Sequence, residues 1–218
     1  MNGINTILHK EFQSFVGSDK GVFLVYIIIV VAWSFMLVSG NGGAAGQFWL
    51  VFFSVIVAAN FSNTVFISER MSGSLEILIT SGLSRNSILF GKMLFVIIMT
   101  AAIGLSCAVL SRLWGVLSVE FGAVEVLGVY DGMLFISATF LNAASSAYLS
   151  VRLSSPRLLH FINLFILGAI VAFYTVVSQL YFLHPSLLVV ILLVTGSVFM
   201  FAARREFSGE RIIQPVIL

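Results

Sequence analysis

Charged residues are scarce in this sequence. Of its 218 residues, 11 are Lys or Arg and 9 are Asp or Glu, together 9% of the chain. A soluble domain carries roughly 25% charged residues, and so few cannot cover the water-exposed surface of a chain of this size. Hydrophobic residues make up 60% of the chain and the mean hydropathy is +1.11. The composition excludes a water-soluble protein and predicts one embedded in lipid.

Cysteine and histidine are also too few for the sites they usually build. The single cysteine, Cys107, lies in an apolar run, which excludes an intramolecular disulfide and a Cys-rich metal site. His9, His160 and His184 are too scattered to form a ligand set. Apart from the pair Arg204-Arg205, the basic residues occur singly, and they never form a patch that could neutralise a row of phosphates, so nucleic acid is not an expected partner.

Motifs for catalysis and nucleotide binding are missing. The only Gly-Lys pair, Gly91-Lys92, is followed by Met93 and has Asn86 where a Walker A loop needs its first glycine. The glycine-rich run at residues 40–46 follows no strand and is expected to be an external turn. No catalytic triad can be assembled, and the apolar segments have no ionisable residue near their centres, which argues against an ion-coupled carrier. We expect no catalytic residue, metal or cofactor on this chain.

Six apolar runs are long enough to be transmembrane helices, since a helix needs about 20 residues to cross a hydrocarbon core of roughly 30 Å. The predicted spans are residues 21–39, 48–67, 93–111, 132–151, 158–178 and 186–203. The chain is therefore expected to form a single all-α transmembrane domain over residues 1–218.

The basic residues orient these spans, because cytoplasmic loops carry the excess of Lys and Arg. With the N-terminus inside, only Arg112 lies outside, and the acidic Glu120, Glu125 and Asp131 also lie outside. The cytoplasmic basic residues are then Lys10, Lys20, Arg70, Arg85, Lys92, Arg152, Arg157, Arg204, Arg205 and Arg211. Both termini, including the tail 204–218, are predicted to be cytoplasmic, in the inner membrane of a bacterium.

Two segments flanking the spans are expected to lie at the membrane surface. Within residues 1–20 the apolar positions recur at helical spacing, which predicts an amphipathic helix on the inner leaflet, with His9, Lys10, Glu11 and Gln13 largely on its other face. Those apolar positions are Ile4, Ile7, Leu8, Phe12 and Phe15. Residues 112–131 form either an external helix or a re-entrant hairpin.

One cytoplasmic loop, residues 68–92, is much longer than a connection between two spans requires. Gly73 is a candidate N-cap with Glu76 three residues on, Gly82 a left-handed C-cap, and Ser84 a cap for the next span. Leu75, Leu78 and Ile79 form an apolar stripe. This pattern predicts a short amphipathic helix that presents Glu69, Arg70, Ser72 and Glu76 to the cytoplasm. Loops of this length are usually functional or disordered, so docking is favoured over a mere connector.

Polar residues also occur inside two predicted spans. Asn60, Asn63 and Thr64 share one face of the second span by the i, i+3, i+4 rule. They either pack against neighbouring helices or line a pathway. The fourth span has Thr139, Asn142, Ser145 and Ser146 among alanines, a composition typical of close helix packing with interhelical hydrogen bonds.

The long loop resembles a motif of type-2 ATP-binding-cassette permeases, the exporter-type membrane subunits. The matching residues are Glu69-Arg70, Gly73-Ser74-Leu75-Glu76, a turn centred on Ser84, and Gly91-Lys92. The start Lys10-Glu11-Phe12 and the pair Ser154-Ser155 are also similar to that family. The resemblance implies a coupling helix that fits a groove on a separate ATPase subunit, which holds ATP and magnesium. It also implies pairing with a second copy or a second permease.

Some alternatives stay open at this point. The haem-exporter permease of cytochrome-c maturation shares the Gly-Ser-Leu-Glu box, but it usually has prolines at span five, where residues 158–178 have none. No proline follows the predicted coupling helix either, unlike the common family pattern. A gliding-motility or sodium-efflux type permease fits the Lys-Glu-Phe start better. In a different class, a membrane scaffold or sensor would use the same loop to dock another cytoplasmic protein.

Overall fold

A computed structural model describes residues 3–17, 20–39, 44–117, 128–153, 155–181, 184 and 186–207. The described residues are almost entirely helical and contain no strand. Predictions that concern residues 118–127, Ser154 and the tail 208–218 lie outside the described residues.

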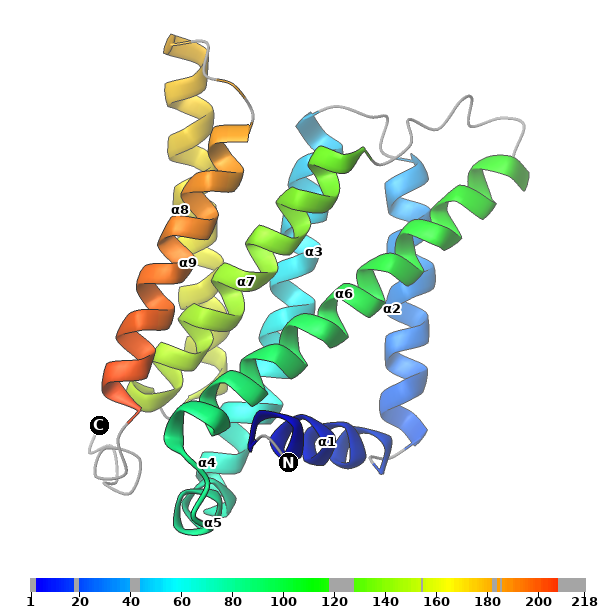
Figure 1. The fold of residues 1–218 in the computed structure, drawn as a ribbon. Coiled ribbons are helices and arrows are strands. Elements are labelled where there is room, and N and C mark those ends of the chain that lie inside the picture. The colour runs from blue at the N-terminus through cyan, green and yellow to red at the C-terminus, as the bar shows by residue number, and fades with distance from the viewer. Residues whose placement is uncertain are drawn as a thin grey trace.

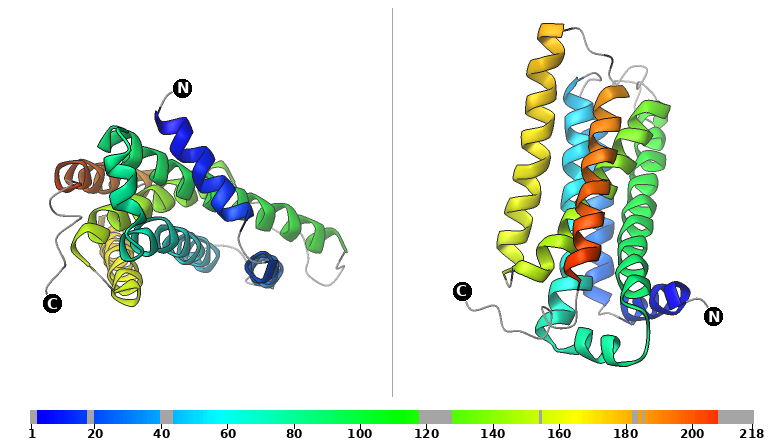
Figure 2. Two further views of the ribbon diagram at one scale, coloured as in Figure 1. Left: turned by 90° about the horizontal axis from the view of Figure 1, so that it is seen from below. Right: turned by 60° about the vertical axis from the view of Figure 1, so that its left-hand side comes forward.

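Long helices form a bundle, and short ones lie at one end of it (Figure 1). The long elements are α2 (Lys20–Ser39), α3 (Ala44–Ser62), α6 (Arg85–Leu117), α7 (Val129–Arg152), α8 (Pro156–Tyr181) and α9 (Ser186–Glu206). At the base, α1 (Gly3–Val16) lies across α6, while α4 (Glu69–Met71) and α5 (Ser74–Thr80) lie below the bundle (Figure 2). The described ends of the chain are at this same end (Figure 1).

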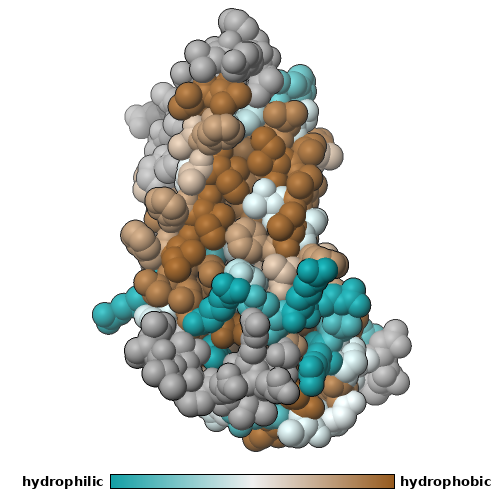
Figure 3. Space-filling model, turned by 90° about the vertical axis from the view of Figure 1, so that its left-hand side faces the viewer, coloured by the Kyte–Doolittle hydropathy of each residue, from teal (hydrophilic) through white to brown (hydrophobic). Residues whose placement is uncertain are grey.

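Five helical segments are long and apolar enough to cross a membrane. They are Leu50–Met71, Arg85–Leu117, Val129–Arg152, Arg157–Val177 and Ser186–Glu206. Helix α2 contains a shorter apolar segment, Leu24–Leu37. On the side where α8 and α9 lie, an apolar surface covers the upper part of the molecule and hydrophilic residues gather beneath it (Figure 3). These features are those of a multi-pass membrane protein.

The third predicted span is longer than expected, which corrects the sequence analysis. Helix α6 begins at Arg85, directly after the predicted cap Ser84, and continues to Leu117, past the predicted end of the span at residue 111. Residues 112–117 therefore extend this helix instead of starting a separate external segment. It crosses the bundle at a slant (Figure 1). Helix α3 also continues, through a π-helical turn (η1, Asn63–Ser68), into α4.

Helix α7 occupies the centre of the bundle because its side chains are small. Its alanines at 138, 143, 144 and 147 are fully buried, which lets α3 and α9 approach closely. Asn163 of α8 joins it, since Ser145 Oγ donates to Asn163 Oδ1 (2.8 Å) and Asn163 Nδ2 donates to Ser146 Oγ (2.6 Å). The predicted packing role of this polar segment is confirmed, although the buried amide of Asn142 makes no hydrogen bond to any described group.

The apolar face of α1 packs on the protein. Ile7 is 1% exposed. The rings of Phe12 and Phe95 pack edge-on with their centroids 5.2 Å apart, and the ring centroids of Phe15 and Phe61 are 5.7 Å apart. The predicted amphipathic helix is therefore present, and its apolar stripe is covered by α6 and α3. Glu11, expected on the opposite face, is 4% exposed, so that expectation was wrong.

The crossing of α1 and α6 depends on Gly91. A Cβ at this position would lie 2.8 Å from both Cβ and Cγ2 of Ile7 and 3.2 Å from the carbonyl oxygen of Ile4. We therefore expect Gly91→Ala to lower the free energy of unfolding by about 1–3 kcal/mol, the usual cost of overpacking. Unfolding in detergent micelles, followed by circular dichroism, measures this change.

A glycine elsewhere provides the matched control. A methyl group added at Gly168 in α8 would meet no atom within 4 Å, so Gly168→Ala is expected to raise stability by about 0.5–1 kcal/mol through helix propensity. If Gly91→Ala is as stabilising as Gly168→Ala, the close crossing is not present in the protein.

Candidate functional site

The loop between α3 and α6 is ordered by two glycines and a serine. Gly73, with φ 73°, precedes α5, and Gly82, with φ 80°, follows it; this left-handed conformation favours glycine. The hydroxyl of Ser84 accepts a hydrogen bond from the backbone N–H of Ser87 (3.1 Å) and caps α6. The predicted caps at Gly73, Gly82 and Ser84 are confirmed. Glu76 lies in the first turn of α5, but its carboxylate makes no hydrogen bond to a described group.

Helix α5 has one face against the bundle and one face free. Leu75 is 3% exposed, and Leu78 and Ile79 pack beside it, as the apolar stripe predicted. Ile77 on the other side is 70% exposed, and Met71 just before the helix is 69% exposed. Two large apolar side chains therefore project from the base of the molecule, within a segment whose other exposed residues are Ser72, Thr80, Ser81 and Gly82.

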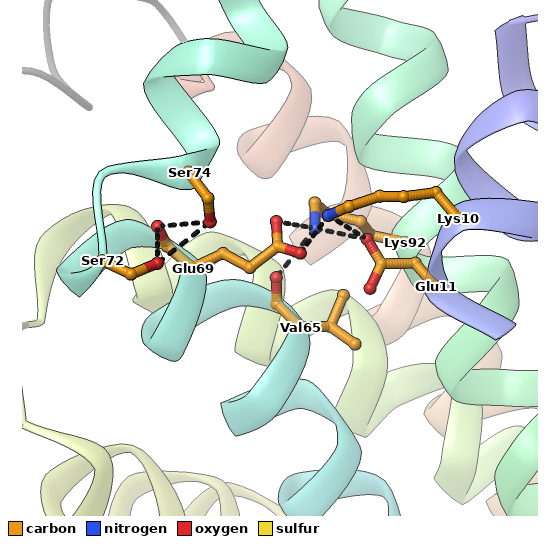
Figure 4. A network of polar contacts seen from close by, with 7 residues as sticks. All are labelled: Lys10, Glu11, Val65, Glu69, Ser72, Ser74 and Lys92. Atoms are coloured by element: carbon orange, nitrogen blue, oxygen red, sulfur yellow. Dashed lines mark hydrogen bonds and ion pairs between the residues drawn. The ribbon is translucent and has the colours of Figure 1, made fainter. Parts of the chain in front are cut away.

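A buried lysine connects this loop to the rest of the protein (Figure 4). Lys92 of α6 is 0% exposed, and its ammonium donates to Glu11 Oε1 (2.8 Å), to Glu69 Oε2 (2.5 Å) and to the carbonyl oxygen of Val65 (2.9 Å). An ammonium has three protons to donate, so each finds an acceptor. The three acceptors belong to α1, α4 and η1.

Lys10 completes the cluster on its exposed side. Its ammonium pairs with Glu69 and lies 3.3 Å from Glu11 Oε1. Partial burial by itself lowers the pKa of Lys10, but the hydrogen bond to Glu69 and the negative charges of Glu11 and Glu69 outweigh it and raise the pKa above its ordinary value. The cluster thus combines two ammonium groups with two carboxylates and is neutral overall.

The backbone around Glu69 is held by neighbouring hydroxyls. Both Ser72 and Ser74 donate to the carbonyl oxygen of Glu69, each at 3.2 Å (Figure 4). Val65, whose carbonyl meets Lys92, belongs to the π-helical turn. Such turns are rare and occur frequently at functional sites.

Arg70 attaches the loop to the central helix. Its Nη1 donates to the carbonyl oxygens of Ser150 (2.7 Å) and Val151 (2.9 Å), in the last turn of α7. These carbonyls have no partner within their own helix, and a cation there also interacts favourably with the helix dipole. Adjacent residues of the loop therefore contact different parts of the molecule: Glu69 contacts α1 and α6, and Arg70 contacts α7.

The structure brings most of the predicted coupling residues together, but with different exposures. Gly73, Ser74, Leu75 and Glu76 form the turn and first half of α5, as expected. Glu69 and Arg70, expected to face the cytoplasm, instead turn into the protein, and Gly91 and Lys92 are buried. The expectation for Glu69 and Arg70 was wrong because both side chains have partners on other helices, Lys92 of α6 and the last turn of α7.

The role of Glu11 was not predicted from the sequence. A signal was available, because Glu11 follows Ile7 by four residues and so falls within the apolar stripe of α1. A carboxylate in that position requires a cation from the facing helix. Lys92 is that cation.

The candidate pathway residues lie at the end of α3 and in η1. Asn60 is partly buried, Thr64 is exposed and donates to the carbonyl oxygen of Asn60 (3.1 Å), and Asn63 Oδ1 is buried without a hydrogen bond to a described group. Whether they line a pathway stays a prediction.

Comparisons with known proteins do not assign the chain to a family. No protein-family model matches the chain, and no curated protein matches it. Among the described residues, no three His, Cys, Asp or Glu side chains come together as a metal site would require. The loop and the buried cluster above it are therefore the features from which a function can be inferred.

Proposed function

We propose that this chain is the membrane-spanning permease subunit of an ATP-binding-cassette transporter, of the exporter type, with ATP hydrolysed by a separate cytoplasmic subunit. One observation supports the proposal above the others. A short helix with an exposed apolar side chain, Ile77, lies below the bundle. The residues just before it are joined to three other helices, by ion pairs from Glu69 to α1 and α6 and by hydrogen bonds from Arg70 to α7.

The proposal includes six spans with both termini in the cytoplasm. Helix α2 has 20 residues, about the length a bilayer requires, and would be the sixth span. The described ends of the chain and α5 lie at one end of the bundle (Figure 1). Most of the basic residues belong to that end, which supports its placement on the inner side of a bacterial cytoplasmic membrane.

Helix α5 would be the coupling helix, whose movement is transmitted by the contacts of its neighbours. A displacement of α5 would move Glu69, which is paired with Lys92 of α6 and Lys10 of α1, and through these ion pairs would move both helices. The same displacement would move Arg70 and, through its hydrogen bonds, the last turn of α7. Two copies, or one copy and a second permease, would complete the pathway, with Asn60, Asn63 and Thr64 as candidate lining residues. ATP and magnesium would bind to the partner.

Replacing Ile77 by aspartate tests this proposal. Ile77 is 70% exposed, so the change leaves the fold intact and places a charge on the docking surface. We expect Ile77→Asp to weaken binding of the ATPase subunit at least about ten-fold, because a lone carboxylate in an apolar interface is costly. Co-purification with a Walker A protein encoded nearby, and stimulation of its ATPase activity, measure the effect.

A charge added beside the docking surface is the matched control. Asn86 is exposed in the first turn of α6, and Asn86→Asp introduces the same charge at the same end of the molecule. We expect this variant to assemble like the unchanged chain. Capture of a protein without ATPase activity, lost in Ile77→Asp, would instead support a scaffold or sensor. Unchanged assembly and ATPase stimulation in Ile77→Asp would overturn the coupling proposal.

A further inference from the structure

A shallow groove of about 440 Å³ runs along the outer face of α9. It is lined by Leu193, Val194, Ser197, Val198 and Phe201. The hydroxyl of Ser197 donates to the carbonyl oxygen of Leu193 (2.8 Å), so it offers little polarity to the groove. Val194, Val198 and Phe201 are each more than half exposed, which gives the groove apolar walls along two turns of helix.

The groove leads to an arginine at the base of the helix. Val194, Val198, Phe201 and Arg205 follow one another at spacings of four, three and four residues, which places them on one face of α9. The guanidinium of Arg205 lies 4.6 Å from the centroid of the Phe201 ring, a cation–π contact that fixes its position at the end of the groove.

The positive charge at this end is not neutralised by described residues. Arg204 and Arg205 are both exposed, and neither makes an ion pair with a described residue. The nearest acidic residue in the sequence, Glu206, is already paired with Arg152 of α7. Figure 3 shows hydrophilic residues gathered beneath the apolar surface on this side of the molecule. The apolar groove is thus followed by two exposed guanidinium groups that form no ion pair with a described carboxylate.

We propose that this face of α9 binds an anionic glycerophospholipid, with an acyl chain in the groove and the phosphate held by Arg204 and Arg205. Guanidinium groups bind phosphate with geometric specificity, and anionic lipids attract basic residues next to the membrane. A zwitterionic lipid would fill the groove equally well but would neutralise the arginines less. The inference needs only that the chain spans a membrane, so it stands apart from the proposed transport function.

Lipid retention by the purified full-length chain tests the proposal. The protein is reconstituted in phosphatidylcholine mixed with phosphatidylglycerol, extracted in mild detergent, and the lipids retained on it are counted by native mass spectrometry. We expect phosphatidylglycerol to be enriched on the protein over the bulk mixture. Arg205→Gln should reduce this enrichment about five-fold, equivalent to about 1 kcal/mol per basic residue near an anionic membrane surface.

Two further variants separate the parts of the site. Ser197→Trp fills the groove without changing charge and should also reduce retention. Arg85→Gln removes an exposed arginine at the same end of the molecule, on α6 and away from the groove, and should leave retention unchanged. Equal loss in Arg85→Gln and Arg205→Gln would overturn the proposal, as would displacement of the lipid by inorganic phosphate alone. ATPase stimulation plays no part in this readout, so failure here leaves the coupling proposal untouched.

Discussion

Replacing Lys92 by alanine is expected to lower the free energy of unfolding by about 3–5 kcal/mol, the cost of breaking a buried ion pair by removing one partner. The variant leaves Glu11, only 4% exposed, without its cation and leaves the carbonyl oxygen of Val65 without its donor. Glu69 keeps only its contact with the more exposed Lys10. Chemical unfolding in detergent micelles, followed by circular dichroism, measures the loss.

Two comparisons test whether burial of the ion pairs causes the loss of stability in Lys92→Ala. The side chain of Lys10 is 38% exposed, so Lys10→Ala is expected to cost less than about 1 kcal/mol, as exposed ion pairs do. Neutralising the whole buried set with Glu11→Gln, Glu69→Gln and Lys92→Met should recover much of the stability lost in Lys92→Ala. A loss below about 1 kcal/mol in Lys92→Ala would contradict the buried cluster.

Replacing Arg70 by methionine is expected to cost about 3 kcal/mol. Methionine keeps much of the side-chain volume but removes two hydrogen bonds from a charged donor to the carbonyls of Ser150 and Val151, each worth about 1.5–3 kcal/mol. Both residues are buried, so water does not readily replace the guanidinium. The same unfolding measurement applies, and amide hydrogen exchange should show faster opening of the last turn of α7.

Arginine at this position is expected to be superior to lysine. The planar guanidinium is pre-organised and loses less side-chain entropy for each hydrogen bond than the flexible lysine side chain does, so Arg70→Lys should recover only part of the loss. Arg85→Met provides the control, because Arg85 is exposed at the start of α6. If Arg70→Met and Arg85→Met have the same small effect, the contacts between the loop and α7 do not hold the two together.

Local structure in the loop could be predicted from the sequence because it depends on neighbouring residues. Gly73 and Gly82 bracket α5 with left-handed turns, and Ser84 caps α6 through a bond to a residue three positions on. Each of these features involves a few consecutive residues and one known conformational preference. The long apolar runs were predicted for a similar reason, since helix length follows from bilayer thickness.

Contacts between distant residues could not be predicted in the same way. Lys92 and Glu11 are 81 positions apart, and Arg70 and Ser150 are 80 apart. A charged residue beside a membrane span is ordinarily assigned to water or lipid headgroups. Lys92 is covered by protein because α1 crosses α6 at Gly91, and this crossing cannot be read from the sequence. The sequence pattern contained the charges but not the information that they meet.

The slant of α6 relates the position of the loop to the thickness of the bilayer. With 33 residues this helix is about 50 Å long, whereas a hydrocarbon core is roughly 30 Å thick. A helix of excess length accommodates the mismatch by tilting, and a thinner bilayer requires more tilt than a thicker one. Because Ser84 joins the end of α6 directly to the loop, we expect the position of α5 relative to the membrane surface to change with the thickness of the surrounding lipid.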